Sequence, residues 1–249
     1  MSQSALRTLR LLEYLAVAGP SSLTSIAGQL HLNKSTAHRF VKTLVETGYA
    51  HQDPATRAYG LTTKVMELGA QVLRRIEVRK EVGPALQEMA RLSGETSHLA
   101  ILEDHEIVYV DKVEGAQAVQ MASRIGSRGT CHSTALGKVL LSSRAEAEWA
   151  GYAAVTGLPR RTSRTITDPG RLAQELRRVR RAGYAIDDVE NEEGIRCVAA
   201  PIRDHTGEVV AAMSVSGWTV SMTPARVREL VPVVKEQARK ASLRLGYTD

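Results

Sequence analysis

Apolar residues recur at helical spacing through most of the first 48 residues. The stretch 4–18, "SALRTLRLLEYLAVA", carries a leucine at almost every third position and predicts an amphipathic helix that Gly19 and Pro20 end. "SLTSIAGQLHL" predicts a second, short helix with Ser21 or Ser22 as its N-cap. After a tight turn at 31–33, "KSTAHRFVKTLVETG" predicts a third helix. Three short helices in this order are expected to share one small core.

The third predicted helix has two chemically different faces. One face is apolar, and the other combines hydroxyl groups and cations with little acid. A helix that simply faces solvent has the same periodicity, but hydroxyls and guanidinium groups are typical of a helix that lies in the major groove of DNA. The candidate DNA-binding residues on this face are Lys34, Ser35, Thr36, His38, Arg39 and Lys42.

A β-hairpin is expected directly after these helices. In "YAHQDPATRAYGLT" two extended segments flank an Asp-Pro turn. Arg57 lies near the predicted tip, where a cation contacts the phosphate backbone or the minor groove and adds affinity rather than sequence discrimination. Three helices followed by such a wing predict a winged helix-turn-helix DNA-binding domain over residues 1–62.

The remaining chain predicts a linker helix and a larger domain of mixed structure. Val65, Leu68, Val72 and Ile76 form an apolar stripe in a helix over 63–78, which can pack against a second copy of the chain. Residues 79–249 then alternate between strand and helix patterns and predict an α+β domain, an antiparallel sheet covered by helices. Its expected strands are "SHLAILED", "EIVYVDKVEG", "AVQMASRIG", "CVAAPIRD" and "EVVAAMSVSG", and its expected helices are "RKEVGPALQEMARLSG", "STALGKVLLSS", "RAEAEWAGYAAV", "DPGRLAQELRRVRRAGY" and "PARVRELVPVVKEQARKASLRLG".

Composition narrows the class of protein. The 249 residues are 43% hydrophobic, and no apolar run approaches the roughly 18 residues that span a membrane, so a soluble, cytoplasmic protein without membrane contact is expected. The net charge of +6 suits a polyanionic partner, and the cationic cluster at 34–42 points to DNA. With only two cysteines the fold does not rest on disulfides, and no cofactor is indicated.

The stretch 124–138, "RIGSRGTCHSTALGK", raises three chemical possibilities. A nucleotide-binding loop needs a glycine at position 132 and a serine or threonine at 139, where this chain has His132 and Val139. A Cys131 nucleophile would need a base from elsewhere in the fold, because adjacent side chains seldom point at each other. A variant of this second possibility, a zinc site built from Cys131, His132 and Cys197, lacks the usual ligand spacing. We therefore expect structural or pocket-lining roles for these residues and no metal.

The third possibility is a helix N-terminus that receives an anion. Ser133 or Thr134 can cap the helix through "ALGKVLL" and leave backbone N–H groups free at its start. A carboxylate is attracted to such an end, with Met121 and Leu136 covering the body of a small organic acid. Three further residues can add donors or acceptors: Ser214 and Ser216, which share one face of a strand, and Asp187, which is expected in a loop.

Several segments carry a family resemblance. The first helix ending in Gly-Pro, the run "LTSIAGQLHLNKSTAHRFVKTLVETGY", the "YGLT" that closes the wing, and the later "CHSTALGK" and "GYAIDDVENEEGIRCVAAPI" resemble the IclR family of bacterial transcriptional regulators over almost the whole chain. The resemblance implies a winged helix-turn-helix domain, a linker helix and a GAF-like effector-binding domain. It also implies a homodimer or a dimer of dimers.

The resemblance further implies which residues line an effector pocket. Carried over by motif, they are Met121, Ala135, Leu136, Asp187, Ile195, Cys197, Ser214 and Ser216. The sequence thus predicts a regulator, not an enzyme, that binds a palindromic double-stranded DNA operator as a dimer and senses a small molecule, expected to be a carboxylate. The alternatives are an enzyme with a cysteine nucleophile in a GAF-like domain and an unregulated architectural DNA-binding protein.

Overall fold

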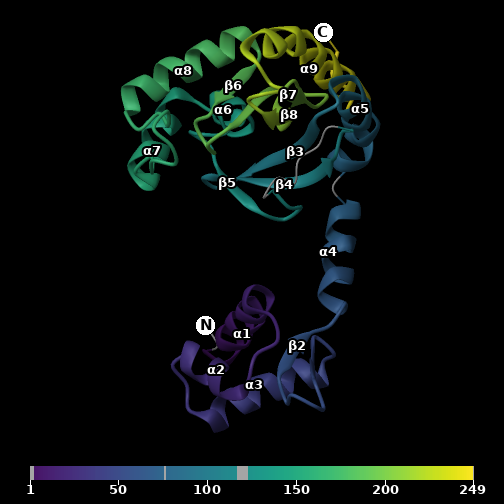
Figure 1. Ribbon diagram of the computed structural model, residues 1–249, viewed down its shortest axis with the longest axis vertical. Helices are drawn as coiled ribbons and strands as arrows, with labels where there is room; N and C mark the ends of the chain where they lie inside the picture. Colours follow the sequence, from purple (N-terminus) through teal and green to yellow (C-terminus); the bar gives the residue numbers. More distant parts are fainter. Residues whose placement is uncertain (1–2, 76, 117–122, 249) are drawn as a thin grey trace. The chain divides into compact units, whose positions relative to one another are not determined.

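The computed structural model describes residues 3–75, 77–116 and 123–248 (Figure 1). The chain forms two compact units, Met1–Arg75 and Ile76–Asp249. The boundary between them falls within the residues 63–78 for which a linker helix is expected. Within the described residues, no helix is both long and apolar enough to cross a lipid bilayer.

The first unit contains three helices, a two-stranded hairpin and a fourth helix. The helices α1 (Gln3–Ala18), α2 (Leu23–Gln29) and α3 (Lys34–Glu46) precede strands β1 (Ala50–Gln52) and β2 (Tyr59–Leu61), and α4 (Lys64–Arg75) follows. Ser22 caps α2 by accepting a hydrogen bond from the Ser25 N–H at 3.1 Å. The buried core residues of this unit are Leu11, Leu15, Ile26, Ala27, Ala37, Phe40, Val41, Leu44, Ala50 and Tyr59.

The hairpin turns tightly through residues 53–57. The Asp53 carboxylate accepts hydrogen bonds from the N–H groups of Ala55 and Thr56 at 2.9 and 2.7 Å, and these bonds lower the pKa of Asp53. Arg57 closes the turn with a positive φ of 60°, and its side chain is exposed. The predicted wing with Arg57 near its tip is therefore present.

The second unit is built on one antiparallel six-stranded sheet with the order β5-β4-β3-β8-β7-β6. The strands are β3 (Thr96–Glu103), β4 (Glu106–Val113), β5 (Arg128–Thr130), β6 (Ala185–Asp188), β7 (Ile195–Arg203) and β8 (Val209–Trp218). The helices are α5 (Glu77–Ser93), α6 (Ala135–Ser142), α7 (Glu146–Thr156), α8 (Pro169–Ala182) and α9 (Pro224–Arg244). This arrangement is the predicted α+β fold.

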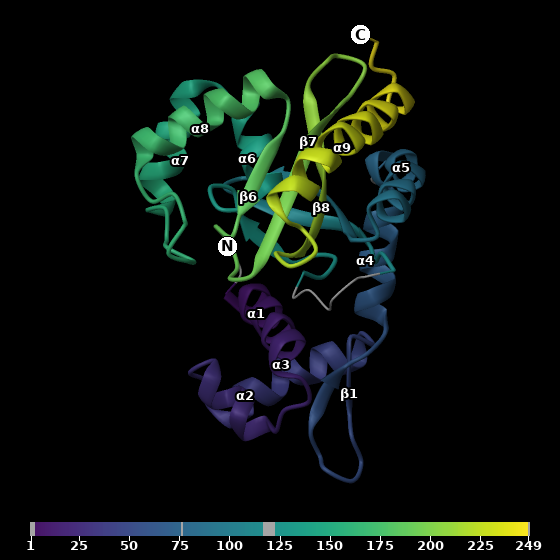
Figure 2. The same ribbon diagram turned by 45° about the horizontal axis from the view of Figure 1, so that its top comes forward.

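Helices cover both faces of this sheet (Figure 2). The pair α5 and α9 packs on one face, against large strand residues such as Leu99, Val198 and Met213. Helices α6, α7 and α8 belong to the other core, where the strands present Ala100, Ala199, Ala212 and other small residues. The alternation of side chains along each strand separates the two cores, and the small residues leave room for α6 close to the sheet.

Two expectations about the strands need correction. Of the strand expected over "AVQMASRIG", residues 118–122 lie outside the described part of the chain, while 123–126 are not extended into a strand and β5 begins only at Arg128. Conversely, Asp187 lies in strand β6 and is 2% exposed, not in a solvated loop. Strand β6 pairs only with β7, at the edge of the sheet. Its sequence is short and acidic and lacks the usual strand pattern.

Candidate functional site

Helix α3 has the two predicted faces. Ala37, Phe40, Val41 and Leu44 are buried in the core of the first unit. On the opposite side Lys34, Ser35, His38, Arg39 and Lys42 are exposed and Thr36 is half-buried. Asn33 caps the helix through its side-chain oxygen, 2.8 Å from the Thr36 N–H. The cap and the apolar face together fix which side chains point outward.

The exposed cations of α3 are held loosely. Lys42 forms an ion pair with Glu46 at 3.5 Å, and both side chains are about two-thirds exposed, so the pair contributes little to stability. The Arg39 guanidinium lies 5.4 Å from the centre of the Phe40 ring, which supports its stem without occupying its N–H donors. Both cations therefore keep donors available for a phosphate or a base edge.

The second unit encloses a cavity of about 350 Å³ at the N-terminal end of α6. Seven of the eight effector-pocket residues expected from the sequence line it: Ala135, Leu136, Asp187, Ile195, Cys197, Ser214 and Ser216. The eighth, Met121, lies outside the described residues. Residues from α6, β6, β7 and β8 thus meet around one space, although up to 81 positions separate them in the chain.

The register of the sheet explains why the cavity wall is polar. Asp187 pairs with Cys197, Cys197 with Ser216, and Ser216 with Thr96, so one row of small polar groups crosses four strands. In the next row His98 pairs with Ser214. Residues directly opposite each other in a sheet point to the same face. The sheet therefore presents a polar strip to the cavity and an apolar surface to α5 and α9.

His98 is a cavity residue that the sequence analysis did not select. It is 2% exposed, its Nε2 lies 2.8 Å from the Ser123 hydroxyl, and its Nδ1 lies 3.4 Å from the Ser216 hydroxyl. Burial, together with the nearby charge of Lys112, lowers the pKa of His98 to about 3. The ring is therefore neutral at physiological pH and can both donate and accept a hydrogen bond.

Asp187 is the acidic group in the cavity wall. Burial raises its pKa to about 7, an effect that the nearby Lys138 charge and two backbone donors oppose. Its Oδ1 accepts hydrogen bonds from the N–H groups of Glu190 and Asn191 at 2.7 and 3.3 Å. With a pKa close to neutrality, this carboxyl group can donate a hydrogen bond to a bound molecule when protonated and accept one when ionised.

Neither cysteine has the environment of a nucleophile. Burial raises the pKa of Cys131 to about 12 and that of Cys197 well above its ordinary value, so both remain thiols. His132 does not activate Cys131, because its two ring nitrogens are engaged by the Tyr152 hydroxyl at 2.9 Å and the Pro159 carbonyl at 3.0 Å. The Cys-His pair therefore has the structural role that the sequence analysis expected. Among the described residues, no cluster of His, Cys, Asp and Glu could hold a metal ion.

The Gly-Lys pair of α6 also has a structural role. A Cβ atom on Gly137 would lie 2.3 Å from the Cys131 Cα, so only glycine allows this close approach. Lys138 is fully buried, and its Nζ donates to the Ile186 carbonyl at 2.5 Å and to Glu190 at 2.6 Å. Thr134 caps the helix by accepting from the Gly137 N–H at 3.1 Å. The Gly-Lys pair therefore does not form a phosphate-binding loop at the cavity end of α6.

Further cavity residues carry no clear signal in the sequence. Arg161 reaches the cavity from the connection between α7 and α8, and its guanidinium has no hydrogen bond or ion pair with the described residues. Asn191 accepts a hydrogen bond from the Ser133 hydroxyl at 2.9 Å. Tyr109 packs edge-on against His98, with ring centres 5.4 Å apart. Only the folded chain brings these residues together.

Comparison with known families covers both units. The IclR helix-turn-helix domain matches residues 4–54, and the C-terminal domain of bacterial transcriptional regulator IclR matches residues 70–243. The chain belongs to the IclR family. Its winged helix-turn-helix and α+β units are the two domains of this family, and it is a transcriptional regulator, not an enzyme, with an effector-binding C-terminal domain.

Relatives and solved structures of this IclR-family protein cover nearly its whole length. The regulator KdgR of Escherichia coli is 36% identical over 246 residues, 99% of this chain and 94% of the relative. The crystal structure of Thermotoga maritima IclR has a TM-score of 0.83 and 36% identity, covering 98% of each chain. A Microbacterium hydrocarbonoxydans IclR homologue in complex with 4-hydroxybenzoate has a TM-score of 0.85 and 27% identity, covering 98% of this chain and 99% of that one.

Proposed function

We propose that this regulator binds a palindromic operator as a dimer and that a small organic acid, bound in the cavity at α6, alters its operator affinity. The observation that carries the proposal is the polar cavity itself, which gathers seven residues expected from the sequence at one helix N-terminus. A ligand there changes DNA binding only to the extent that it binds the two arrangements of the regulator with different affinity.

The proposed ligand chemistry follows from the groups around the cavity. The N–H groups of Ala135 and Leu136, in the first turn of α6, have no acceptor among the described residues, and such N–H groups bind carboxylates. The unpaired Arg161 guanidinium adds a positive charge. The hydroxyl of Ser214, 1% exposed and without a partner in the described structure, offers a further donor. A carboxylate that also carries a polar substituent fits this set.

DNA binding is proposed for the exposed face of α3 and for the wing. Lys34, Ser35, Thr36, His38, Arg39 and Lys42 would face the major groove, and Arg57 would face the backbone or the minor groove. The dimer is supported by apolar side chains that the first unit leaves in solvent, such as Met66 on α4 at 74% and Leu9 on α1 at 60% exposure. The side chain of Val72 and residue Ile76 of the expected stripe lie outside the described residues.

A pair of serine variants tests the effector site. Thermal denaturation of the full chain is followed with a panel of organic acids, since a ligand that binds the native state raises its stability. For an acid that stabilises the wild type, we expect Ser214→Ala to reduce the shift and Ser97→Ala to leave it unchanged. Ser97 is the matched control because its hydroxyl is also buried without a described partner. It lies on β3 and points to the face of the sheet opposite to that of Ser214. Equal shifts in both variants would remove the cavity from the proposal.

An arginine variant tests the DNA-binding face. With a DNA fragment from upstream of the regulator's own gene, Arg39→Ala should weaken binding by about 1–3 kcal/mol in gel-shift titrations if this side chain reads a base. The control is Arg181→Ala, which removes an exposed arginine from α8 in the second unit. Unchanged affinity in Arg39→Ala would take this residue out of the interface.

A further inference from the structure

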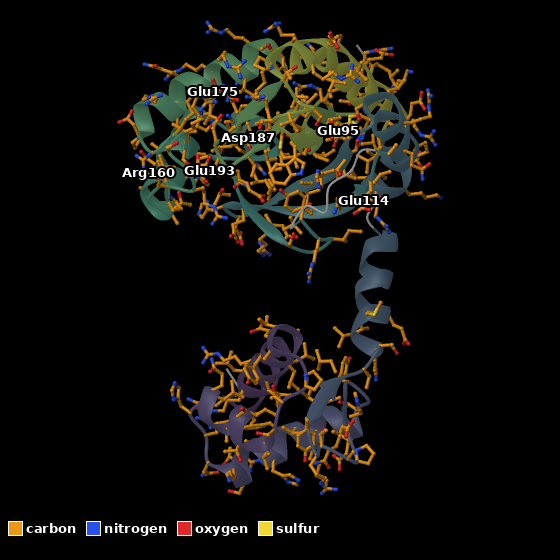
Figure 3. All side chains as sticks on the ribbon, viewed as in Figure 1. Glu95, Glu114, Arg160, Glu175, Asp187 and Glu193 are labelled. Carbon is orange, nitrogen blue, oxygen red and sulfur yellow. The ribbon has the colours of Figure 1, made fainter. Side chains whose placement is uncertain are left out.

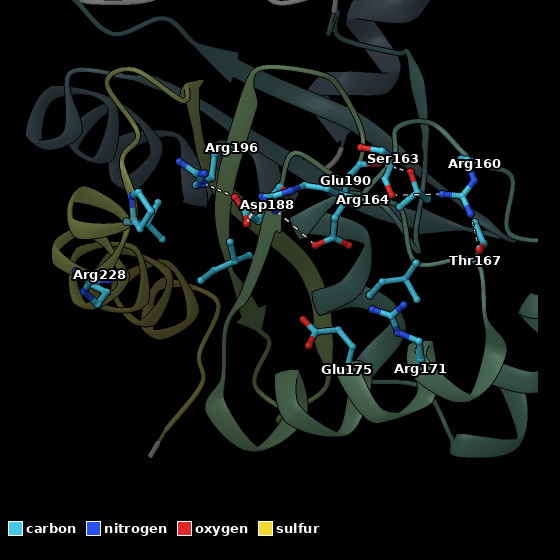
Figure 4. Close-up of a pocket in the computed structure, with 15 residues that line it drawn as sticks. Arg160, Ser163, Arg164, Thr167, Arg171, Glu175, Asp188, Glu190, Arg196 and Arg228 are labelled. Carbon is cyan, nitrogen blue, oxygen red and sulfur yellow. Dashed lines mark hydrogen bonds and ion pairs between the residues drawn. The ribbon is translucent and has the colours of Figure 1, made fainter.

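A second, more open hollow lies on the other side of strand β6. It has a volume of about 740 Å³ and is bounded by β6, by the connection before α8, and by the first turns of α8 and α9 (Figure 4). Five arginines line it: Arg160, Arg164, Arg171, Arg196 and Arg228. We call this hollow the arginine groove. Its volume lies within the range of small-molecule sites, about 300–1,000 Å³.

Each acidic group of the arginine groove is already paired with a cation. Asp188 bonds to Arg164 at 2.5 Å and to Arg196 at 2.6 Å. Glu175 pairs with Arg178 at 2.7 Å, and Glu190 pairs with the buried Lys138 at 2.6 Å; neither cation lines the groove. Of the five groove arginines, only two are therefore engaged by a carboxylate of the groove, which leaves an excess of positive charge.

Arg171 and Arg228 are two of the three arginines that carry this excess. Figure 4 shows both side chains at the groove without a bond to another residue drawn there, and no described residue bonds to either guanidinium. Arg171 belongs to the first turn of α8 and Arg228 to the first turns of α9, so two separate elements each contribute an exposed cation. The third, Arg160, donates to the Thr167 hydroxyl at 3.4 Å and to the Ser163 carbonyl at 3.3 Å.

We propose that the arginine groove binds a small molecule with two or more anionic groups, phosphates or carboxylates, held by Arg171 and Arg228. Each guanidinium presents paired N–H donors that match two oxygens of such a group. The site is distinct from the effector cavity. Asp187 lines the cavity, while its neighbours Ile186 and Asp188 line the groove, because successive side chains of β6 point to opposite sides.

Titration calorimetry with two probe anions tests the groove. Inorganic pyrophosphate and tricarballylate are titrated into the full-length wild type and the variant Arg171→Gln/Arg228→Gln. We expect binding of at least one probe to the wild type, weakened about tenfold or more in the variant, because two charge-assisted contacts are lost. Comparing the probes distinguishes phosphate from carboxylate ligands.

A matched double variant controls for the loss of charge. Arg181→Gln/Lys240→Gln also removes one exposed cation from α8 and one from α9, but neither residue lines the groove. It should bind the probes like the wild type. Equal weakening in both double variants, equal binding by the wild type and Arg171→Gln/Arg228→Gln, or no binding of either probe would overturn the proposal. The proposal would also fail if Arg171→Gln/Arg228→Gln changed the oligomeric state in sedimentation but kept the anion affinity of the wild type. That result would assign the groove to contacts between copies of the chain.

Discussion

The ammonium group of Lys138 lies fully buried among acidic side chains. Its Nζ is 2.6 Å from Glu190 and 3.7 Å from Glu175, and the second oxygen of Glu190 has no partner among the described residues. Burial raises the pKa of Glu190, while Lys138 opposes this rise. A buried ion pair is costly to break because the remaining charge loses its only compensation. The pair joins α6 to the segment after β6 and thereby supports the wall between cavity and groove.

Removal of the Lys138 charge should destabilise the second unit. We expect Lys138→Met to lower the free energy of unfolding by about 3–5 kcal/mol in urea denaturation, because it leaves Glu190 buried and unpaired. The double variant Lys138→Met/Glu190→Gln should recover part of this loss, since no buried charge is then left alone. A double variant less stable than Lys138→Met would show that the pair does not act through charge compensation.

The raised pKa of Asp187 predicts a pH dependence of stability. The carboxyl group binds a proton more tightly in the folded chain, where its pKa is about 7, than in the unfolded chain, where the pKa has its ordinary value of 3.8. Its contribution is therefore fully present below about pH 4 and is lost as the pH rises towards 7, by up to about 1.4 kcal/mol per pH unit. The free-energy difference between wild type and Asp187→Asn should fall over this range in urea titrations. A difference independent of pH would contradict the assignment.

The sequence identifies individual chemical groups better than their partners. The helix cap at Thr134 and the shared face of Ser214 and Ser216 follow from local spacing, and the structure has both. The partner of Lys138 is 52 positions away, and the Asp187 carboxylate accepts hydrogen bonds from the segment after β6, which folds back to it. Arg161 enters the cavity from a connection without a regular pattern. Such encounters depend on tertiary structure and leave no periodic signal.

Helix α6 lies so close to the preceding turn that one residue controls its position. Eight consecutive residues of this helix are buried, and Gly137 passes over the backbone of Cys131. Gly137→Ala should therefore destabilise the second unit strongly, because the added Cβ would lie 2.3 Å from the Cys131 Cα and 2.7 Å from the Cys131 carbonyl oxygen.

A second glycine provides the control for this element. Gly151 lies within α7, and an added Cβ there meets no atom within 4 Å. Gly151→Ala should leave stability unchanged or raise it by about 0.5–1 kcal/mol, since alanine is the better helix former. The two variants are compared by thermal denaturation. Equal stability of Gly137→Ala and wild type would refute the close-packing argument.

Long amphipathic elements follow from the sequence, and short edge strands do not. Helices α1, α3, α8 and α9 have strong apolar periodicity, and the structure has each near the predicted residues. Strand β6 has only four residues, two of them acidic, and its formation depends on pairing with β7. The strand expected at 118–126 rests on alternating apolar residues, and its described part, 123–126, is not strand. Alternation alone does not decide whether a segment finds a partner strand.

The two units have separate hydrophobic cores. All core residues of the first unit lie between Leu11 and Leu61, and those of the second lie between Val78 and Leu245 (Figure 3 draws the side chains of both). A 75-residue unit buries a smaller fraction of its surface than a unit of more than 170 residues and is expected to be less stable. We therefore expect each unit to fold around its own core and to unfold in its own transition.

Calorimetry of two core variants tests this independence. Phe40 is 4% exposed in the first unit, and Phe40→Ala should destabilise that unit by about 3–5 kcal/mol, which is enough to remove its transition. Met213 is fully buried in the second unit, and Met213→Ala should lower the other transition by itself. Phe40→Ala should then lose operator binding while an acid that stabilises the wild type still stabilises the second unit. If either variant shifts both transitions, the units unfold as one, and the cavity at α6 depends on the first unit for its stability.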